Sequence, residues 1–350
     1  MTIDALLEEV RDRPHLADLD TAARRLALRD LVHELAPGAN AAGLVARLSD
    51  EIDGLGILEP LMRDPEVTDV LVNGTDPVWV ERAGRLEITS ARFDRAANLV
   101  ALVERVVGEV GGRLDRARPI ADVRLHDGSR LHAVLPPVAP AGPIVSIRRF
   151  PRCRPSLEDL VQMGTATEEQ AARLADLVAR RKSIAVGGGT GAGKTTLVNA
   201  LLGCVSEDER VVVIEELPEL APSCPHWVSL VTRTANHEGS GAIELEELVR
   251  ASLRMRPDRI VVGEVRGHEA RAALDAFSTG HEGSLLTVHA RSARHASLRL
   301  ASLAARAPGE VRAAAQLRAE FDAALDAIVH VERTRDGRRI AELVERPDDS

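Results

Sequence analysis

The chain has 350 residues, 45% of them hydrophobic and 28% charged, which indicates about two folded domains and excludes a disordered chain. A net charge of -9 and an aromatic content of 2%, with no tyrosine, argue against direct nucleic-acid binding, which usually needs a basic surface or stacking platforms. The three cysteines form no CxxC pair, which argues against a structural zinc site.

Neither a secretory signal nor a membrane span is expected. The first ten residues carry acidic side chains and lack a basic segment followed by an apolar one. No run approaches the roughly 18 apolar residues that a spanning helix needs. We therefore expect a cytoplasmic protein that is peripheral at the inner face of the cell membrane, held there by a partner.

Three segments follow one another along the chain. Residues 1–50 have apolar residues at helical spacing and predict a helical N-terminal extension. Residues 51–152 contain short strand-like segments and one helix-like segment, and predict a small α/β domain. The strand-like segments are 70–72, 78–80, 123–125, 131–135 and 143–147, and the helix-like segment is 99–110.

Strands and helices alternate in residues 153–350, which is typical of a mainly parallel sheet. Pro151 and Pro155 mark the boundary before this domain, and Ser156 with Asp159 resembles the start of a capped helix. The expected strands are 184–186, 211–214, 228–231, 260–262 and 285–288.

The segment GGTGAGKT, residues 188–195, fits the phosphate-loop pattern G-x-x-x-x-G-K-[ST] at every fixed position. Glycines let backbone N–H groups surround a triphosphate, and the helix that follows directs its positive N-terminus at it. We expect Lys194 on the β- and γ-phosphates and Thr195 on Mg²⁺. The alternative is an accidental match, but lysine occurs only at positions 182 and 194 of an arginine-rich chain. The predicted nucleotide contacts are Gly188, Gly189, Thr190, Gly191, Ala192, Gly193, Lys194, Thr195 and Thr196.

A second acidic motif follows the strand at 260–262. Glu264 stands at the carboxyl end of that strand, where ligands bind in open α/β sheets. Many P-loop enzymes have an aspartate at the position of Gly263, so we expect Glu264 to polarise the attacking water as a general base. Arg266 could steady phosphate charge. The alternative is a solvated Glu–Arg pair.

Further carboxylates and histidines are weaker candidates. Glu215, Glu216 and Glu219 follow the strand at 211–214 and could orient Mg²⁺ or water, with Glu215 the predicted metal ligand beside Thr195. Solvated surface acids are the alternative. His281 and His289 do not have the spacing of a zinc pair, and on their own they favour histidines in the core or at a helix end.

These motifs occur in an order that resembles the secretion ATPase superfamily: type II and type IV secretion, type IV pilus and archaellar motor ATPases. The similarity covers roughly residues 50–300 and is closest to the tight-adherence (Cpa/Tad) pilus branch, whose actinobacterial members include a conjugal-transfer-like group. The matching segments are 188–196, 215–220, 256–266 and 279–289, with 69–74, 127–130 and 146–150 upstream.

The resemblance implies a RecA-like P-loop ATPase domain and a smaller N-terminal α/β domain, with ATP between them, in a homohexameric ring that acts on an inner-membrane platform protein. It implies that Arg130 and Arg148 contact phosphates or act across a subunit boundary, and that Glu264 is the catalytic glutamate. It assigns His281 as the histidine that senses or positions the nucleotide. Glu216 departs from the family pattern, which usually has aspartate there.

The predicted function is an Mg²⁺-dependent ATPase that powers pilus assembly or secretion. A GTPase is disfavoured because no Asn-Lys-x-Asp segment exists. One alternative is an ATPase for conjugal DNA transfer or a RecA-like nucleic-acid motor. DNA-stimulated, salt-sensitive ATP hydrolysis would support it. A nucleotide-gated scaffold with little turnover is the alternative outside the enzymes.

Overall fold

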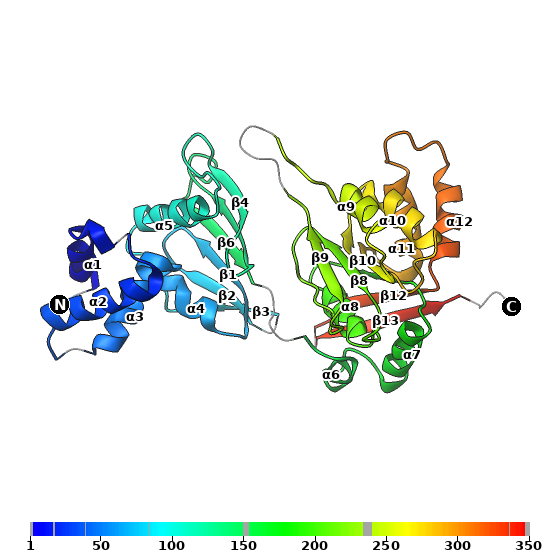
Figure 1. Ribbon diagram of the computed structural model, residues 1–350, viewed down its shortest axis with the longest axis horizontal. Helices are drawn as coiled ribbons and strands as arrows, with labels where there is room; N and C mark the ends of the chain where they lie inside the picture. Colours follow the sequence, from blue (N-terminus) through cyan, green and yellow to red (C-terminus); the bar gives the residue numbers. More distant parts are fainter. Residues whose placement is uncertain are drawn as a thin grey trace. The chain divides into compact units, whose positions relative to one another are not determined.

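The computed structural model describes residues 3–16, 18–38, 40–82, 84–149, 154–233, 240–335 and 337–346. The chain divides into two compact units, Met1–Arg152 and Cys153–Ser350, each with hydrophobic cores of its own (Figure 1). Phe150 of the upstream motif, Pro151 of the predicted boundary, and Cys153 lie outside the described residues. The predicted division into three segments, with a break at residue 50, stays a prediction.

The first unit begins with a helical bundle of α1 (Ile3–Arg11), α2 (Thr21–Leu35) and α3 (Ala41–Asp53), with η1 (Pro14–Leu16) after the first helix. Side-chain oxygens of Asp20 and Asn40 accept backbone N–H bonds at the starts of α2 and α3, which are ordinary N-cap contacts. The apolar faces of the helices meet in a separate small core that includes Leu6, Leu28 and Leu48.

A six-stranded antiparallel sheet follows in the order β3-β2-β1-β6-β5-β4. Helices η2 (Gly56–Leu58), α4 (Glu59–Arg63) and α5 (Ala96–Glu109) supply apolar side chains to the core that covers one face of this sheet. The strands are β1 (Val67–Asn73), β2 (Val78–Arg82), β3 (Arg85–Ile88), β4 (Ile120–Arg124), β5 (Arg130–Val134) and β6 (Ile144–Arg148).

The second unit is built on a seven-stranded sheet in the order β13-β12-β7-β11-β10-β8-β9. Strands β12 to β9 along this order are parallel, and only β13 runs antiparallel to its neighbour. The strands are β7 (Ile184–Gly188), β8 (Val211–Glu215), β9 (Trp227–Val231), β10 (Arg259–Val265), β11 (Leu285–His289), β12 (Ala327–Arg333) and β13 (Arg338–Glu345).

Helices cover both faces of this sheet, so the central strands are continuous apolar runs (Figure 1). One core contains residues of α6 (Leu157–Gln162), α7 (Glu168–Ala179) and α8 (Lys194–Leu202). The other contains residues of α9 (Leu245–Ser252), α10 (Glu269–Ser278), α11 (Ala293–Ala304) and α12 (Ala314–Ala324). The capping box of Ser156 and Asp159 starts α6 as predicted. The predicted α/β fold class, with a mainly parallel sheet that carries a phosphate loop, is confirmed.

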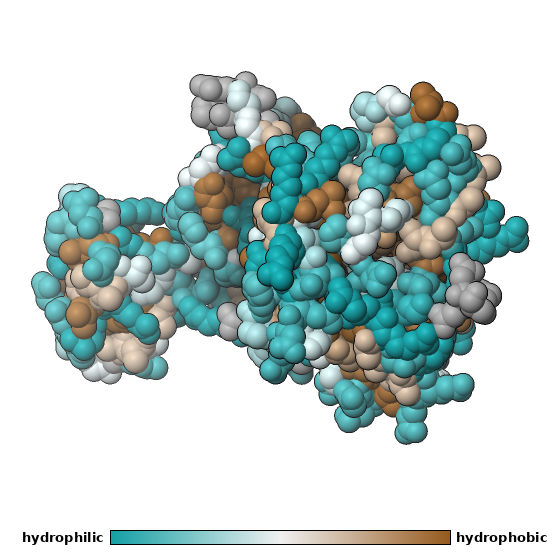
Figure 2. Space-filling view, turned by 45° about the vertical axis from the view of Figure 1, so that its right-hand side comes forward, coloured by the Kyte–Doolittle hydropathy of each residue, from teal (hydrophilic) through white to brown (hydrophobic). Residues whose placement is uncertain are grey.

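Within the described residues, no helix is both long enough and apolar enough to cross a membrane. The face of the molecule shown in Figure 2 is mainly hydrophilic, with hydrophobic residues scattered among hydrophilic ones. Isolated hydrophobic residues of this kind are normal on protein surfaces.

Candidate nucleotide site

The predicted phosphate loop joins β7 to α8 at the edge where the parallel strands end. Gly193 is the N-cap of α8 and has φ of 99°, a left-handed conformation that glycine adopts without a steric penalty. Helix α8 therefore begins at Lys194, and its first N–H groups have no partner within the helix itself. A helix start that follows a curled glycine-rich loop is the arrangement that binds phosphate groups.

The side chain of Lys194 lies inside the loop. Its Nζ donates hydrogen bonds to the carbonyl oxygens of Gly188 and Gly189, at 3.3 and 3.2 Å, and the residue is only 7% exposed. A buried ammonium held by neutral carbonyls exchanges them readily for phosphate oxygens, because a charged acceptor gives a stronger hydrogen bond.

Gly188 is required by the neighbouring strand as well as by the loop. A Cβ atom at this position would lie 2.5 Å from the carbonyl oxygen of Val331 and 2.9 Å from its Cγ2. Val331 belongs to β12 and is the cross-strand partner of Gly188. The first glycine of the loop thus lets β12 pack directly against the point where β7 ends.

Glu264 lies at the end of β10, near enough to Lys194 for the lysine charge to lower the pKa of Glu264. Its Oε1 is 2.7 Å from Nε2 of His289, at the end of β11, and its Oε2 accepts a 2.8 Å hydrogen bond from Arg266. The two strands are parallel neighbours, so their carboxyl ends bring both side chains to one place. His289, a minor candidate from the sequence, is therefore the histidine that contacts the predicted catalytic glutamate.

Burial and neighbouring charges shift the pKa values of Glu264 and His289. Burial alone would raise the pKa of Glu264, but Arg266, Lys194 and His289 together hold that pKa below its ordinary value of 4.5. Burial and the nearby charge of Lys194 lower the pKa of His289 below 6.5, although Glu264 opposes this shift. At neutral pH the structure therefore presents a carboxylate next to an uncharged imidazole.

Glu215, the predicted metal ligand, is buried and accepts hydrogen bonds from backbone N–H groups. Its carboxylate accepts hydrogen bonds from the N–H groups of Glu219 and Leu220, at 3.1 Å each, and so fixes the loop that follows β8. It also explains Gly263, because a Cβ there would lie only 2.7 Å from Glu215 Cγ. The position that carries an acid in many P-loop enzymes is filled here by the side chain of the neighbouring strand.

Glu216 and Glu219 lie on the rim of the site. Glu216 forms a 2.8 Å ion pair with Arg266, and Glu219 adds to the negative charge around that guanidinium. Arg266 thus connects Glu216 to Glu264 across the ends of two strands. The predicted roles of Glu216 and Glu219 in catalysis stay predictions.

Asn199 was not a sequence candidate, yet it helps to build the site. From α8, its Nδ2 donates to the carbonyl oxygen of Glu219 at 3.1 Å, and its Oδ1 accepts from the N–H of Ala221 at 3.0 Å. It therefore ties the helix behind the phosphate loop to the loop after β8. Its place one turn after Thr195, on the helix that follows the phosphate loop, was the only sequence signal.

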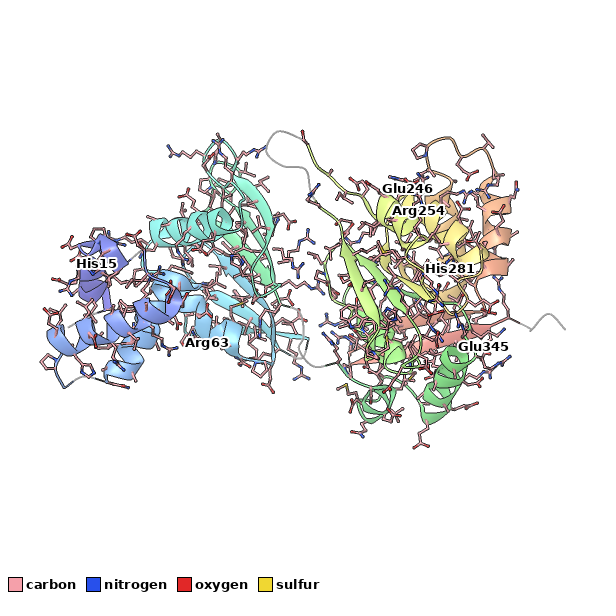
Figure 3. All side chains as sticks on the ribbon, viewed as in Figure 1. His15, Arg63, Glu246, Arg254, His281 and Glu345 are labelled. Carbon is pink, nitrogen blue, oxygen red and sulfur yellow. The ribbon has the colours of Figure 1, made fainter. Side chains whose placement is uncertain are left out.

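The structure does not bring His281 to this place. It precedes β11, and its Nδ1 is 3.0 Å from the carbonyl oxygen of Ala276 at the end of α10. Figure 3 shows His281 on the same side of the second unit as Glu345, which pairs with the first residue of β12. That is the edge where the parallel strands begin, opposite the phosphate loop, so within one unit the arrangement favours His289 for the predicted role.

Arg130 and Arg148 belong to the first unit. They are direct cross-strand partners, and Arg124 is the next partner in the same row across β4, β5 and β6. Arg130 pairs with Asp122, whereas the guanidinium of Arg148 has no hydrogen-bond or ion-pair partner in the described part of the chain. On its other side Arg148 is the cross-strand partner of Asp69 of β1, so three arginines and one carboxylate share this row.

The residues present fit a triphosphate with Mg²⁺ held mainly through the nucleotide. Among the described residues no cluster of three histidine, cysteine or acidic side chains could hold a metal ion alone. Mg²⁺ commonly uses one or two side chains together with phosphate oxygens and waters. Thr195 is the second residue of α8, and the phosphate-loop pattern predicts its hydroxyl for such a contact.

Comparison with known proteins gives a consistent result. Residues 51–336 match the family described as "Type II/IV secretion system protein". A putative conjugal transfer protein of Mycobacterium tuberculosis is 46% identical over 306 residues, 85% of each chain. The conjugal transfer protein TrbB of Rhizobium radiobacter is 33% identical over 310 residues, which is 86% of this chain and 90% of TrbB.

Among solved structures, the pilus retraction motor PilT with bound ADP aligns with a TM-score of 0.60 and 19% identity. The alignment covers 84% of this chain and 83% of PilT. At this identity the similarity shows a shared fold alone.

Proposed function

The chain belongs to the type II/IV secretion system protein family, and from this premise we propose that it binds Mg·ATP at the loop 188–196 and hydrolyses it with Glu264. The observation that carries the proposal is the convergence of Lys194, Glu264 and His289 at one edge of the sheet. The family supports a role of this ATPase in secretion, and relatives named as conjugal transfer proteins support a role in conjugal transfer.

In this mechanism the ammonium of Lys194 leaves the carbonyls of Gly188 and Gly189 and binds the β- and γ-phosphates. The N–H groups at the start of α8 hold the remaining phosphate oxygens. Mg²⁺, held by Thr195 and the phosphates, would neutralise charge on the transferred group.

Glu264 orients and polarises the attacking water, and its lowered pKa keeps it ionised at neutral pH. Nε2 of the His289 imidazole lies 2.7 Å from that carboxylate and limits where its Oε1 can move. Arg266 forms ion pairs with both Glu264 and Glu216. A movement of Glu264 after loss of the γ-phosphate would therefore also displace Glu216 at the end of β8.

We further propose that copies of this chain form a ring, a homohexamer as in the motor ATPases that it resembles, and act on a membrane platform protein. The row that contains Arg130 and Arg148 supports this, because it offers cationic donors to a nucleotide bound by another copy. Mass measurement with and without ATP tests assembly: a single protomer under both conditions would reject the ring.

A second candidate is a motor for conjugal DNA transfer. The relatives from Mycobacterium tuberculosis and Rhizobium radiobacter are named as conjugal transfer proteins, the first of them as putative. DNA-stimulated hydrolysis that falls steeply with salt supports this candidate, and salt-insensitive hydrolysis without stimulation favours a motor that acts only on protein partners.

Turnover by purified variants tests the ATPase directly. We expect Lys194→Ala to lose nucleotide binding. Glu264→Gln should bind ATP but hydrolyse it about 10²- to 10⁴-fold more slowly, the usual contribution of a general base. Glu282→Gln, an exposed glutamate near His281, is the matched control and should keep wild-type turnover. Wild-type turnover by Glu264→Gln would reject the assigned base.

A further inference from the structure

The hairpin of β12 and β13 borders the outer side of the phosphate loop. A Cβ at Gly191 would lie 3.6 Å from Nη1 of Arg333, and one at Gly193 would lie 3.1 Å from Cδ of Arg338. Both arginines belong to the ends of the two strands, next to the turn that joins them. Two guanidinium groups therefore lie against the same glycine-rich loop that holds Lys194.

Arg338 makes a specific contact with that loop. Its Nε donates a 3.0 Å hydrogen bond to the carbonyl oxygen of Gly191. The side chain is exposed, and within the described residues this is its only hydrogen bond, with no ion pair. A guanidinium on an exposed strand would normally find a carboxylate, as the adjacent Arg339 does with Glu332 at 2.6 Å.

The contact controls which way one peptide faces. In a planar trans peptide the carbonyl of Gly191 and the N–H of Ala192 point in opposite directions. The carbonyl is held by Arg338, and the N–H points into the loop, where its 3.4 Å contact with the carbonyl of Gly189 is long and weak. Glycine at 191, with φ of 68°, would otherwise allow this peptide to rotate easily.

We propose that Arg338 is a positioning residue for the nucleotide: by holding the Gly191 carbonyl on the outside, it keeps the Ala192 N–H directed at the bound phosphates. This inference rests on the proposed nucleotide site. Arg338 acts through the loop backbone, so its loss weakens binding of ATP and ADP and leaves the catalytic step at Glu264 unchanged.

Three substitutions separate the hydrogen bond from the charge. Arg338→Gln keeps an N–H donor, because glutamine Nε2 is bonded to Cδ just as arginine Nε is, but it removes the positive charge. Arg338→Met keeps the apolar stem and removes both. Arg338→Lys keeps the charge without a donor at that position. Arg339→Met, on the same strand and paired away from the loop with Glu332, is the matched control.

The readouts are the dissociation constant for ADP in the full chain and the KM and kcat for ATP. Arg338→Met should weaken ADP binding about 10- to 100-fold, as expected for the loss of one hydrogen bond from a charged donor, and raise KM with kcat within about twofold of wild type. Arg338→Gln should restore most of the affinity. Arg339→Met should bind ADP as wild type does.

Two outcomes overturn the proposal. One is wild-type affinity in Arg338→Met. The other is rescue by lysine but not by glutamine, which would make Arg338 a charge contact. A structural role would instead lower the melting temperature and kcat together. Failure of the wild type to bind ADP would reject the proposed function itself, which is a distinct result from wild-type affinity in Arg338→Met.

Discussion

Substitution of Gly188 by alanine should disrupt the nucleotide site, because the new side chain would collide with the neighbouring strand β12. The added Cβ would lie 2.5 Å from the carbonyl oxygen of Val331, 2.9 Å from its Cγ2 and 3.2 Å from Cβ of Ala192. Non-bonded carbon and oxygen atoms are ordinarily about 3.5 Å apart or more, so one backbone segment must move by roughly 1 Å. The carbonyl of Val331 cannot rotate away independently, because β12 is paired with β7 along its length.

The expected cost follows from this geometry. Overpacking a tight interior typically costs about 1–3 kcal/mol, and we expect about 3 kcal/mol here because the closest atom belongs to a backbone rather than to a flexible side chain. For a unit of this size that corresponds to a melting temperature lower by roughly 6–12 °C. Displacement of the first loop residue should also misplace the carbonyls that hold Lys194.

Gly189→Ala is the matched control, because a Cβ at the next position meets no atom within 4 Å and the residue has no positive φ. Both variants should be measured by thermal melting and by ADP binding. We expect Gly188→Ala to lose stability and affinity and Gly189→Ala to stay within about 0.5 kcal/mol of wild type in stability. Equal effects of the two substitutions would refute the argument from close packing.

Two more predictions concern the acidic side of the site. Gly263→Ala should lower the free energy of unfolding in urea by about 1–3 kcal/mol, because the new Cβ crowds Glu215. The double variant with Glu215→Ala should lose less unfolding free energy than the sum of the two single variants. Strict additivity of the two losses would contradict this packing. Arg266→Met should shift the acidic limb of the pH–kcat profile to higher pH, because Glu264 then loses the ion pair that opposes the effect of burial; an unchanged limb would show that Arg266 does not set that pKa.

Much of the architecture was readable from the sequence. Apolar runs such as 184–186 and 260–262 correspond to β7 and β10, because central parallel strands are buried on both faces and leave a strong signal. The phosphate loop and its helix were predicted from spacing alone, since the chemistry of phosphate binding restricts glycine and lysine to fixed positions.

The sequence reading missed what depends on long-range contacts. The β12–β13 hairpin was not predicted, although Asp336-Gly337 between two apolar runs is a hairpin signal. The placement of His289 beside Glu264 depends on β10 and β11 being neighbours, which no local pattern specifies. The same holds for the contacts of Glu215, whose carboxylate accepts backbone N–H groups and covers Gly263, while its predicted role as a metal ligand stays a prediction.

The most direct test of the central claim is a crystal structure of the full chain with Mg²⁺ and a non-hydrolysable ATP analogue. The account predicts that Nζ of Lys194 leaves the carbonyls of Gly188 and Gly189 for the phosphates, with a water molecule between the γ-phosphate and the carboxylate of Glu264. An analogue bound elsewhere, or a bound γ-phosphate with Glu264 turned away from it, would contradict the account.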